Sequence, residues 1–128
     1  MASELRVNTL KDASGNNSIA TSFVAGGSAK QWVNFNGTGT IAIRDSLNTT
    51  SLTDNGTGDQ SVTIANDMDN ANYSLSITSN NVQTAIGDAT NWSKTDPTVT
   101  LYRLITRGSG SSYQDSQFVC CEVHGDLA

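Results

Sequence analysis

The feature that most constrains this chain is a repeated alternation of apolar and polar residues, broken by turns rich in asparagine and glycine. Three runs carry the alternation: Thr40–Arg44, Ser61–Ala65 and Tyr73–Thr78. A period of two places one set of side chains on a buried face and the other in water, which is the pattern of a half-buried β-strand. Asn-Gly and glycine-rich sequences adopt positive φ at little cost, so they favour turns. The predicted turns are Asn36–Gly39, Asp54–Asp59 and Asn66–Asn72.

Further strands are predicted on either side of these runs. They are Gln31–Phe35, a polar strand over Leu47–Leu52, Thr98–Thr106 and Gln117–Val123. We expect Trp32 and Phe35 to anchor the core, and Asn81–Thr95 to form a long loop with at most one helical turn. About seven or eight short strands without a sustained helical period predict an all-β fold, an antiparallel β-sandwich (jelly-roll-like) or a barrel.

Residues 1–30 differ from this body. Leu5–Leu10 and Ile19–Val24 are short extended runs separated by the loop Lys11–Asn17, and Gly26–Ser28 is a flexible joint. A segment with so few apolar residues cannot bury enough surface to hold itself closed. We therefore predict an extended N-terminal arm over 1–30 that is ordered by binding a neighbour, followed by a β-sandwich domain over 31–128. The alternative is a disordered terminus.

Composition limits the classes of partner. Only 36% of the residues are apolar, which favours a β-protein that completes its core by association with other subunits. Seven scattered Lys and Arg against 12 Asp and Glu give a net charge of −5, which disfavours nucleic acid. No apolar run approaches the length of a membrane span, and Met1–Ala13 lacks the apolar run of a signal peptide. We expect synthesis in the cytoplasm and no membrane insertion.

No residue pattern favours catalysis. His124 is the single histidine, a nucleophile elbow is absent, and no pair of acids stands on adjacent predicted strands. Asn66–Asn70 is rich in oxygen ligands for a cation such as calcium, but it lacks the glycine and glutamate of an EF-hand loop, so a backbone turn is favoured. Cys120 and Cys121 are predicted to be free thiols on opposite faces of a strand. We expect no enzymatic activity, no metal and no cofactor.

Aromatic and amide side chains in the predicted outer loops are suited to contact a polar ligand such as a glycan, because such rings combine an apolar body with a polar edge. The candidates are Asn91, Trp92, Tyr113 and Gln114. For Trp92, packing beneath its own loop is the alternative.

Two long segments resemble proteins of one viral family. ASELRVNTLKDASGNNSIAT at Ala2–Thr21, and the stretch Ala29–Tyr73 that contains WVNFNGTGTIAIRDS, resemble fibre and appendage proteins of tailed bacteriophages, including those that infect marine cyanobacteria. The ending VHGDLA at Val123–Ala128 is similar to the terminal strand and tail of that family. The chain departs from the family over Val82–Gln117 and in part of its last strand, so the resemblance says least about surface specificity.

The resemblance implies a trimeric virion structural protein, assembled in the host cytoplasm, whose N-terminal arm docks on other virion proteins of the tail or capsid. The implied docking residues are Leu5, Val7, Leu10, Ile19 and Phe23. The predicted contacts between subunits of the homotrimer are Leu104 and Phe118. The protein is then a tail fibre or spike whose outer loops bind host surface polysaccharide, or a capsid decoration or adaptor protein without a host ligand. A polysaccharide-degrading enzyme is the least favoured third function, since no acid pair or metal cluster emerges.

Overall fold

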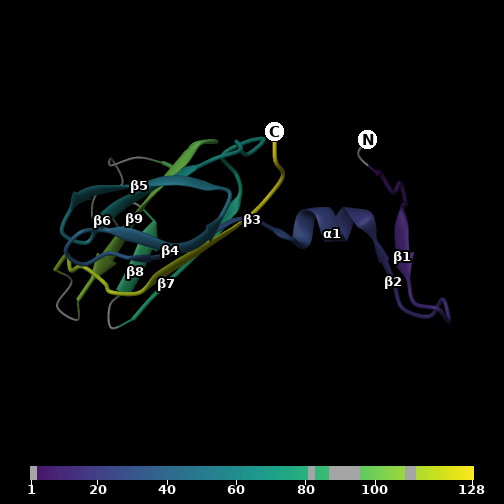
Figure 1. Cartoon of the computed structure of the whole chain (residues 1–128), viewed down its shortest axis with the longest axis horizontal. Coiled ribbons are helices and arrows are strands. Elements are labelled where there is room, and N and C mark those ends of the chain that lie inside the picture. The colour runs from purple at the N-terminus through teal and green to yellow at the C-terminus, as the bar shows by residue number, and fades with distance from the viewer. Residues whose placement is uncertain (1–2, 81–82, 87–95, 109–111) are drawn as a thin grey trace.

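The chain forms a β-sheet body and an N-terminal segment that lies away from it (Figure 1). The computed structural model describes residues 3–80, 83–86, 96–108 and 112–128. These residues form ten strands and one short helix. The N-terminal segment contains the hairpin of β1 (Thr9–Lys11) and β2 (Ser18–Ala20), followed by α1 (Thr21–Gly27).

The body consists of two four-stranded sheets in which all neighbouring strands are antiparallel. The first sheet has the order β4 (Ala42–Leu47), β3 (Ala29–Asn36), β10 (Val119–His124) and β7 (Ser74–Ser79). The second has the order β5 (Thr49–Gly56), β6 (Asp59–Ile64), β9 (Leu101–Arg107) and β8 (Gln83–Ile86). The strands belong to two separate sheets, which confirms the prediction of an all-β antiparallel sandwich.

The core lies between the two sheets, and the period-two alternation fills it from both sides. The first sheet contributes the buried side chains Val33, Phe35, Val119, Cys121 and Val123. The second contributes Val62, Ile64, Tyr102 and Leu104. Full burial of a side chain such as Phe35 stabilises the fold by about 1.5–3 kcal/mol. Val62 and Ile64 of the predicted strand Ser61–Ala65 therefore face the core. Within Thr98–Thr106, Tyr102 and Leu104 face the core, whereas Leu101 on the other side of β9 is only partly buried.

Trp32 does not belong to this core, contrary to the prediction. Along β3, Gln31, Val33 and Phe35 are buried, whereas Trp32 and Asn34 are only partly buried. Alternate residues of a strand point to opposite faces of the sheet, so only every second side chain of β3 can face the core. Two apolar residues and a glutamine take the inner face, so Trp32 lies on the outer face of the first sheet.

The expectation of strands and loops without a helix is wrong for Thr21–Gly27, which forms α1. The C-terminal end of this helix is held locally. The Ser28 N–H donates to the carbonyl of Val24 at 3.1 Å, and the Lys30 ammonium donates to the carbonyls of Ala25 and Ser28. These contacts satisfy carbonyls that a short helix otherwise leaves without partners, and the apolar pattern does not reveal them.

The helical turn predicted within Asn81–Thr95 is also wrong for its described part, because Gln83–Ile86 is strand β8. This strand pairs with β9 from Gln83 opposite Arg107 to Ile86 opposite Leu104. The apolar spacing in this segment favours a helix only weakly, and pairing with an exposed strand edge outweighs so weak a local preference.

Two buried glutamines differ in their hydrogen bonds. Gln31 accepts a hydrogen bond at Oε1 from the hydroxyl of Tyr102 at 3.0 Å and donates from Nε2 to Thr49 Oγ1 at 2.8 Å. Gln60 is fully buried on the core-facing side of β6, and neither Nε2 nor Oε1 has a partner among the described residues. A buried amide without partners costs free energy, whereas a satisfied amide does not.

We therefore expect opposite effects from the same substitution at these two positions. Gln60→Met should raise the free energy of unfolding by about 1–2 kcal/mol, because it removes an unpartnered amide. Gln31→Met should lower it by about 1–3 kcal/mol, because it leaves the Tyr102 hydroxyl without its acceptor. Urea denaturation of the two variants and the parent chain measures both changes. An equal loss at both positions would contradict the assignment for Gln60.

Candidate functional site

The N-terminal segment exposes apolar side chains that a folded chain normally buries. Leu5 is 82% exposed and Phe23 is 73% exposed, and no residue of α1 is buried. The exposed large apolar residues of this segment are Leu5, Val7, Leu10, Ile19, Phe23 and Val24. The five residues that the sequence indicated as docking residues are all among them. Their docking role itself stays a prediction.

The hairpin of β1 and β2 arranges two of these residues as one apolar face. Leu10 and Ile19 are direct cross-strand partners, so their side chains lie on the same face of the hairpin. The partners on either side, Thr9 with Ala20 and Lys11 with Ser18, lie on the other face. A two-stranded hairpin is only marginally stable in water, so this face is suited to binding another surface.

The loop of this hairpin is held by Asp12. Its carboxylate accepts hydrogen bonds from the backbone N–H of Asn16 at 3.0 Å and from Nδ2 of Asn17 at 2.7 Å. The side-chain hydrogen bond of Asn17 holds the pKa of Asp12 below its usual value. The predicted loop Lys11–Asn17 is thus an organised turn that fixes the register of Leu10 against Ile19.

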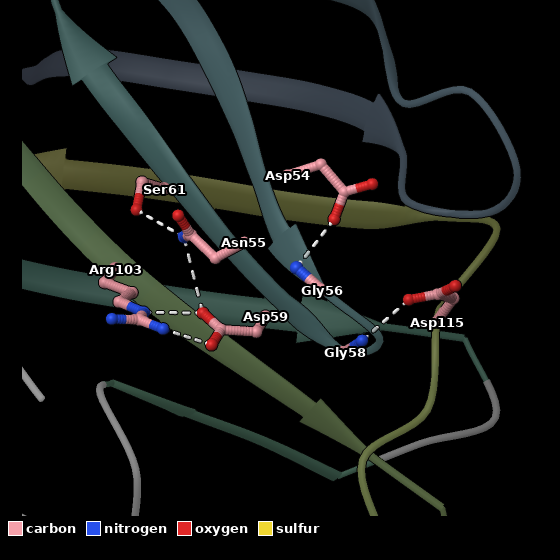
Figure 2. A network of polar contacts seen from close by, with 8 residues as sticks. All are labelled: Asp54, Asn55, Gly56, Gly58, Asp59, Ser61, Arg103 and Asp115. Carbon is pink, nitrogen blue, oxygen red and sulfur yellow. Dashed lines mark hydrogen bonds and ion pairs between the residues drawn. The ribbon is translucent and has the colours of Figure 1, made fainter.

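At one end of the sandwich, a polar network joins the β5–β6 hairpin to the segment that precedes β10. Figure 2 shows Asp115 accepting a hydrogen bond from the backbone N–H of Gly58 at 2.6 Å, and Asp54 accepting one from Gly56 at 2.9 Å. Thr106 adds a backbone link to Gly58 at 2.9 Å. These contacts hold the 112–118 segment against the end of the second sheet.

An ion pair lies on the outer side of the same sheet. In Figure 2, the guanidinium of Arg103 approaches both carboxylate oxygens of Asp59, and Asn55 bridges Asp59 and Ser61. The Asp59 side chain is only 6% exposed and that of Arg103 is 19% exposed. Both charges of the pair are already engaged with each other, so this arrangement supports the strand pairing of β6 and β9 rather than a reaction.

The predicted glycan-binding residues divide between described and undescribed parts of the chain. Asn91 and Trp92 lie outside the described residues. Tyr113 is half-buried, with its ring centroid 5.1 Å from the guanidinium carbon of Arg107, whereas Gln114 is exposed. The Gln114 backbone is held by a hydrogen bond to the carbonyl of Thr106 at 3.0 Å. Tyr113 therefore packs against its own sheet and offers only part of its ring to a ligand.

The two predicted subunit contacts have different surroundings. Leu104 is fully buried in the core of the single chain, so it has no surface to offer a partner, and its prediction as an interface residue is wrong. Its inward position on β9 explains this. Phe118 is 45% exposed and packs beneath the Arg44 guanidinium, whose carbon lies 4.1 Å from the ring centroid. Phe118 remains available for a subunit contact.

The Asn66–Asn72 segment is held by its own side chains and by backbone hydrogen bonds to Val99 and Asp126. Asn70 accepts a hydrogen bond from the Asn72 N–H at 2.8 Å, and its Nδ2 donates to Asp69 at 3.1 Å. Within the described ranges, no group of three or more His, Cys, Asp or Glu side chains is placed to hold a metal ion. The single histidine, His124, lies on β10, with its Nε2 3.3 Å from Oε1 of Glu122.

No helix among the described residues is long and apolar enough to cross a membrane. Comparison with protein-family models, curated proteins and solved structures found no match for the chain. The geometry described above is therefore the basis for a functional assignment, together with the resemblance in the sequence.

The crowding at Gly58 yields a test of the network at the sandwich end. Gly58 has a φ of +64°, and a Cβ there would lie 2.4 Å from the Thr106 carbonyl oxygen and 2.6 Å from the Gln114 nitrogen. We expect Gly58→Ala to lower the free energy of unfolding by about 2–4 kcal/mol, from positive φ and overpacking together. Gly39 has nearly the same φ, +62°, with nothing within 4 Å of the added Cβ. Gly39→Ala should cost only about 1–2 kcal/mol in the same denaturation experiment; equal losses would count against the crowding.

The adjacent thiols should react differently. Both are free, with Cys120 exposed and Cys121 buried, which confirms the prediction of opposite faces. Burial raises the pKa of the Cys121 thiol to about 12, and reactivity requires the thiolate. We expect one thiol per folded chain to react with a disulfide reagent at pH 8, and both to react in denaturant. The Cys120→Ser variant should show no reactive thiol while folded; rapid reaction of that variant would contradict the burial of Cys121.

Proposed function

We propose that the chain is a structural protein of a tailed-bacteriophage particle, anchored by its N-terminal segment and presenting the β-sandwich outward. The observation that supports this best is the set of exposed apolar side chains between Leu5 and Val24. Apolar side chains gathered in this way mark an interaction surface rather than a free end. The sandwich has its own core between two sheets and does not use these residues.

The partner that fits this segment is another protein of the particle. The hairpin presents Leu10 and Ile19 on one face, and Phe23 is exposed on α1, which follows the hairpin. Burial of these three side chains against a partner would supply the stabilisation that an isolated hairpin lacks. Permanent burial of that kind suits an assembled particle, in which each copy is held in place.

Assembly as a homotrimer is part of the same proposal. The sandwich leaves several large apolar side chains exposed in the single chain, among them Leu47, Phe118 and Leu127. With Leu104 buried in the core, Phe118 carries the predicted subunit contact. Light scattering of the purified protein should give three times the mass of one 13.5 kDa chain; a single-chain mass would remove the trimer from the proposal.

A tail fibre or spike and a capsid decoration protein require the same anchor, and they differ in location. A tail position favours attachment to the host surface, with glycan as the ligand of the sandwich. A capsid position favours decoration without a host ligand. Electron cryomicroscopy of intact particles, with antibody against the chain, distinguishes the two, and absence of the chain from particles would refute the proposal as a whole.

The anchor can be tested by charge on one face of the hairpin. We expect Leu10→Glu with Ile19→Glu to reduce incorporation into particles at least tenfold, because two buried carboxylates oppose docking. The matched control is Thr9→Glu with Ser18→Glu, which places the same charges on the other face of the same strands. Incorporation is measured by quantitative blotting of purified particles. Unchanged thermal unfolding of the sandwich in both variants shows that the fold is intact, and equal loss in both would contradict a face-specific anchor.

A further inference from the structure

A groove of about 430 Å³ lies on the outer face of the first sheet. It crosses β3, β10 and β7 and is lined by Trp32, Val33, Asn34, Ser76, Thr78, Cys120, Cys121 and Glu122. Its volume falls within the range of about 300–1,000 Å³ that is usual for small-molecule sites. None of these residues was predicted as a ligand contact from the sequence.

Strand register arranges the lining as two rows across the sheet. Trp32 pairs with Glu122, which pairs with Ser76. In the next row, Asn34 pairs with Cys120, which pairs with Thr78. Because neighbouring strands lie about 4.8 Å apart, the groove extends about 10 Å from the indole on β3 to the hydroxyls on β7. An aromatic surface therefore stands at one side of the groove and hydroxyl groups at the other.

The hydrogen-bonding groups of the groove are largely unused within the chain. In the part of the chain that the structure describes, the indole N–H of Trp32 and the hydroxyls of Ser76 and Thr78 have no hydrogen-bond partner. Glu122 is about half exposed, and one of its oxygens lies 3.3 Å from His124 Nε2. The groove thus offers three donors and a carboxylate acceptor beside a flat apolar ring.

We propose that this groove binds a neutral sugar ring, stacked on Trp32 and hydrogen-bonded to Ser76, Thr78 and Glu122. A pyranose carries an apolar C–H face and a rim of hydroxyl groups, and these match an aromatic surface flanked by donors and an acceptor. The carboxylate accepts hydrogen bonds from sugar hydroxyls and repels acidic sugars.

The nearby cation does not alter this preference for a neutral ligand. Arg44 donates to Asn34 Oδ1 at 3.3 Å and to the carbonyl of Gln117 at 2.7 Å, and its guanidinium covers the ring of Phe118. Two of its five N–H donors are used in these contacts, and Arg44 is not among the residues that line the groove. The net charge of −5 also opposes an anionic ligand.

A second copy of the chain fits the groove less well. The centres of protein interfaces are depleted in charged residues, whereas Glu122 lies on β10, the middle strand of this groove, with a side chain 52% exposed. Serine and threonine at the facing positions are likewise suited to water and to a hydroxylated ligand. Sugar binding at this sheet rests on the proposed function in its tail-fibre form and names the class of ligand. It can be tested on the purified chain without any particle.

The test is a titration of the purified full chain with neutral oligosaccharides of mannose, galactose, glucose and N-acetylglucosamine, into the millimolar range. An oligomer of galacturonic acid is the acidic comparison. Binding is followed by nuclear magnetic resonance, and its location by the alkylation rate of Cys120, whose thiol lines the groove. We expect at least one neutral sugar to bind, to slow Cys120 alkylation at least fivefold, and the acidic oligomer to have no effect.

Two tryptophan variants locate the site. Trp32→Ala should weaken binding at least tenfold, whereas Trp92→Ala, in the loop that the sequence indicated, should leave it unchanged. Glu122→Gln keeps the shape of the side chain and should weaken binding several-fold without disturbing the fold, so the test does not depend on the stability of Trp32→Ala. Binding lost in Trp92→Ala alone would overturn the proposal in favour of the loop.

Two further outcomes would also overturn it. The first is no binding of any neutral sugar in the series by the parent chain. The second is a smaller oligomeric mass for Trp32→Ala by light scattering, which would assign the face to contact between copies. Neither outcome depends on incorporation into particles, so failure of the sugar site and failure of the virion assignment are distinguishable.

Discussion

The hydrogen bond between Tyr102 and Gln31 fixes how the two sheets face each other. Tyr102 stands on β9 of the second sheet and Gln31 on β3 of the first, and the donor and acceptor oxygens lie 3.0 Å apart in the core. Apolar packing alone tolerates small slips between layers, because it has no direction. A buried directional bond does not tolerate them, because a slip leaves a hydroxyl and an amide unpartnered. Gln31 extends the constraint to Thr49 at the start of β5, so one side chain connects three strands.

This constraint also explains the orientation of β3, and with it the position of the groove. Gln31, Val33 and Phe35 share the inner face, so Trp32 and Asn34 must share the outer one. The size of Trp32 predicts burial in the core, whereas the structure places it on the outer face of the first sheet. The sequence does contain a signal for the observed orientation. Val33 and Phe35 are two residues apart and therefore share one face of the strand, and Trp32 between them must lie on the other. In this strand the alternation of residues predicts the inner face better than residue size does.

The alternating runs predicted most of the sandwich because their signal is local. Val62 with Ile64, and Cys120 against Cys121, occupy the faces that period two assigns to them. The parts that could not be predicted depend on distant partners. Strand β8 exists through its pairing with β9, and the burial of Leu104 depends on which face of β9 meets the other sheet. A single sequence holds no direct record of either contact. The end of α1 is a local feature, but it rests on Ser28 and Lys30 side chains rather than on apolar spacing.

The apolar face of the N-terminal hairpin and the groove on the first sheet differ in the free-energy change that burial would bring. Around Leu10 and Ile19 the exposed groups are apolar, so contact with water is unfavourable and lasting burial is favoured. In the groove, Ser76, Thr78 and Glu122 are well solvated when empty, so a ligand must replace water with hydrogen bonds of similar quality. The first surface therefore suits a permanent attachment, and the second suits weak, reversible contact. Weak contacts of this kind add up to tight binding when several copies are held on one support. A lasting attachment through the N-terminal segment would therefore raise the overall affinity of grooves that each bind a ligand weakly.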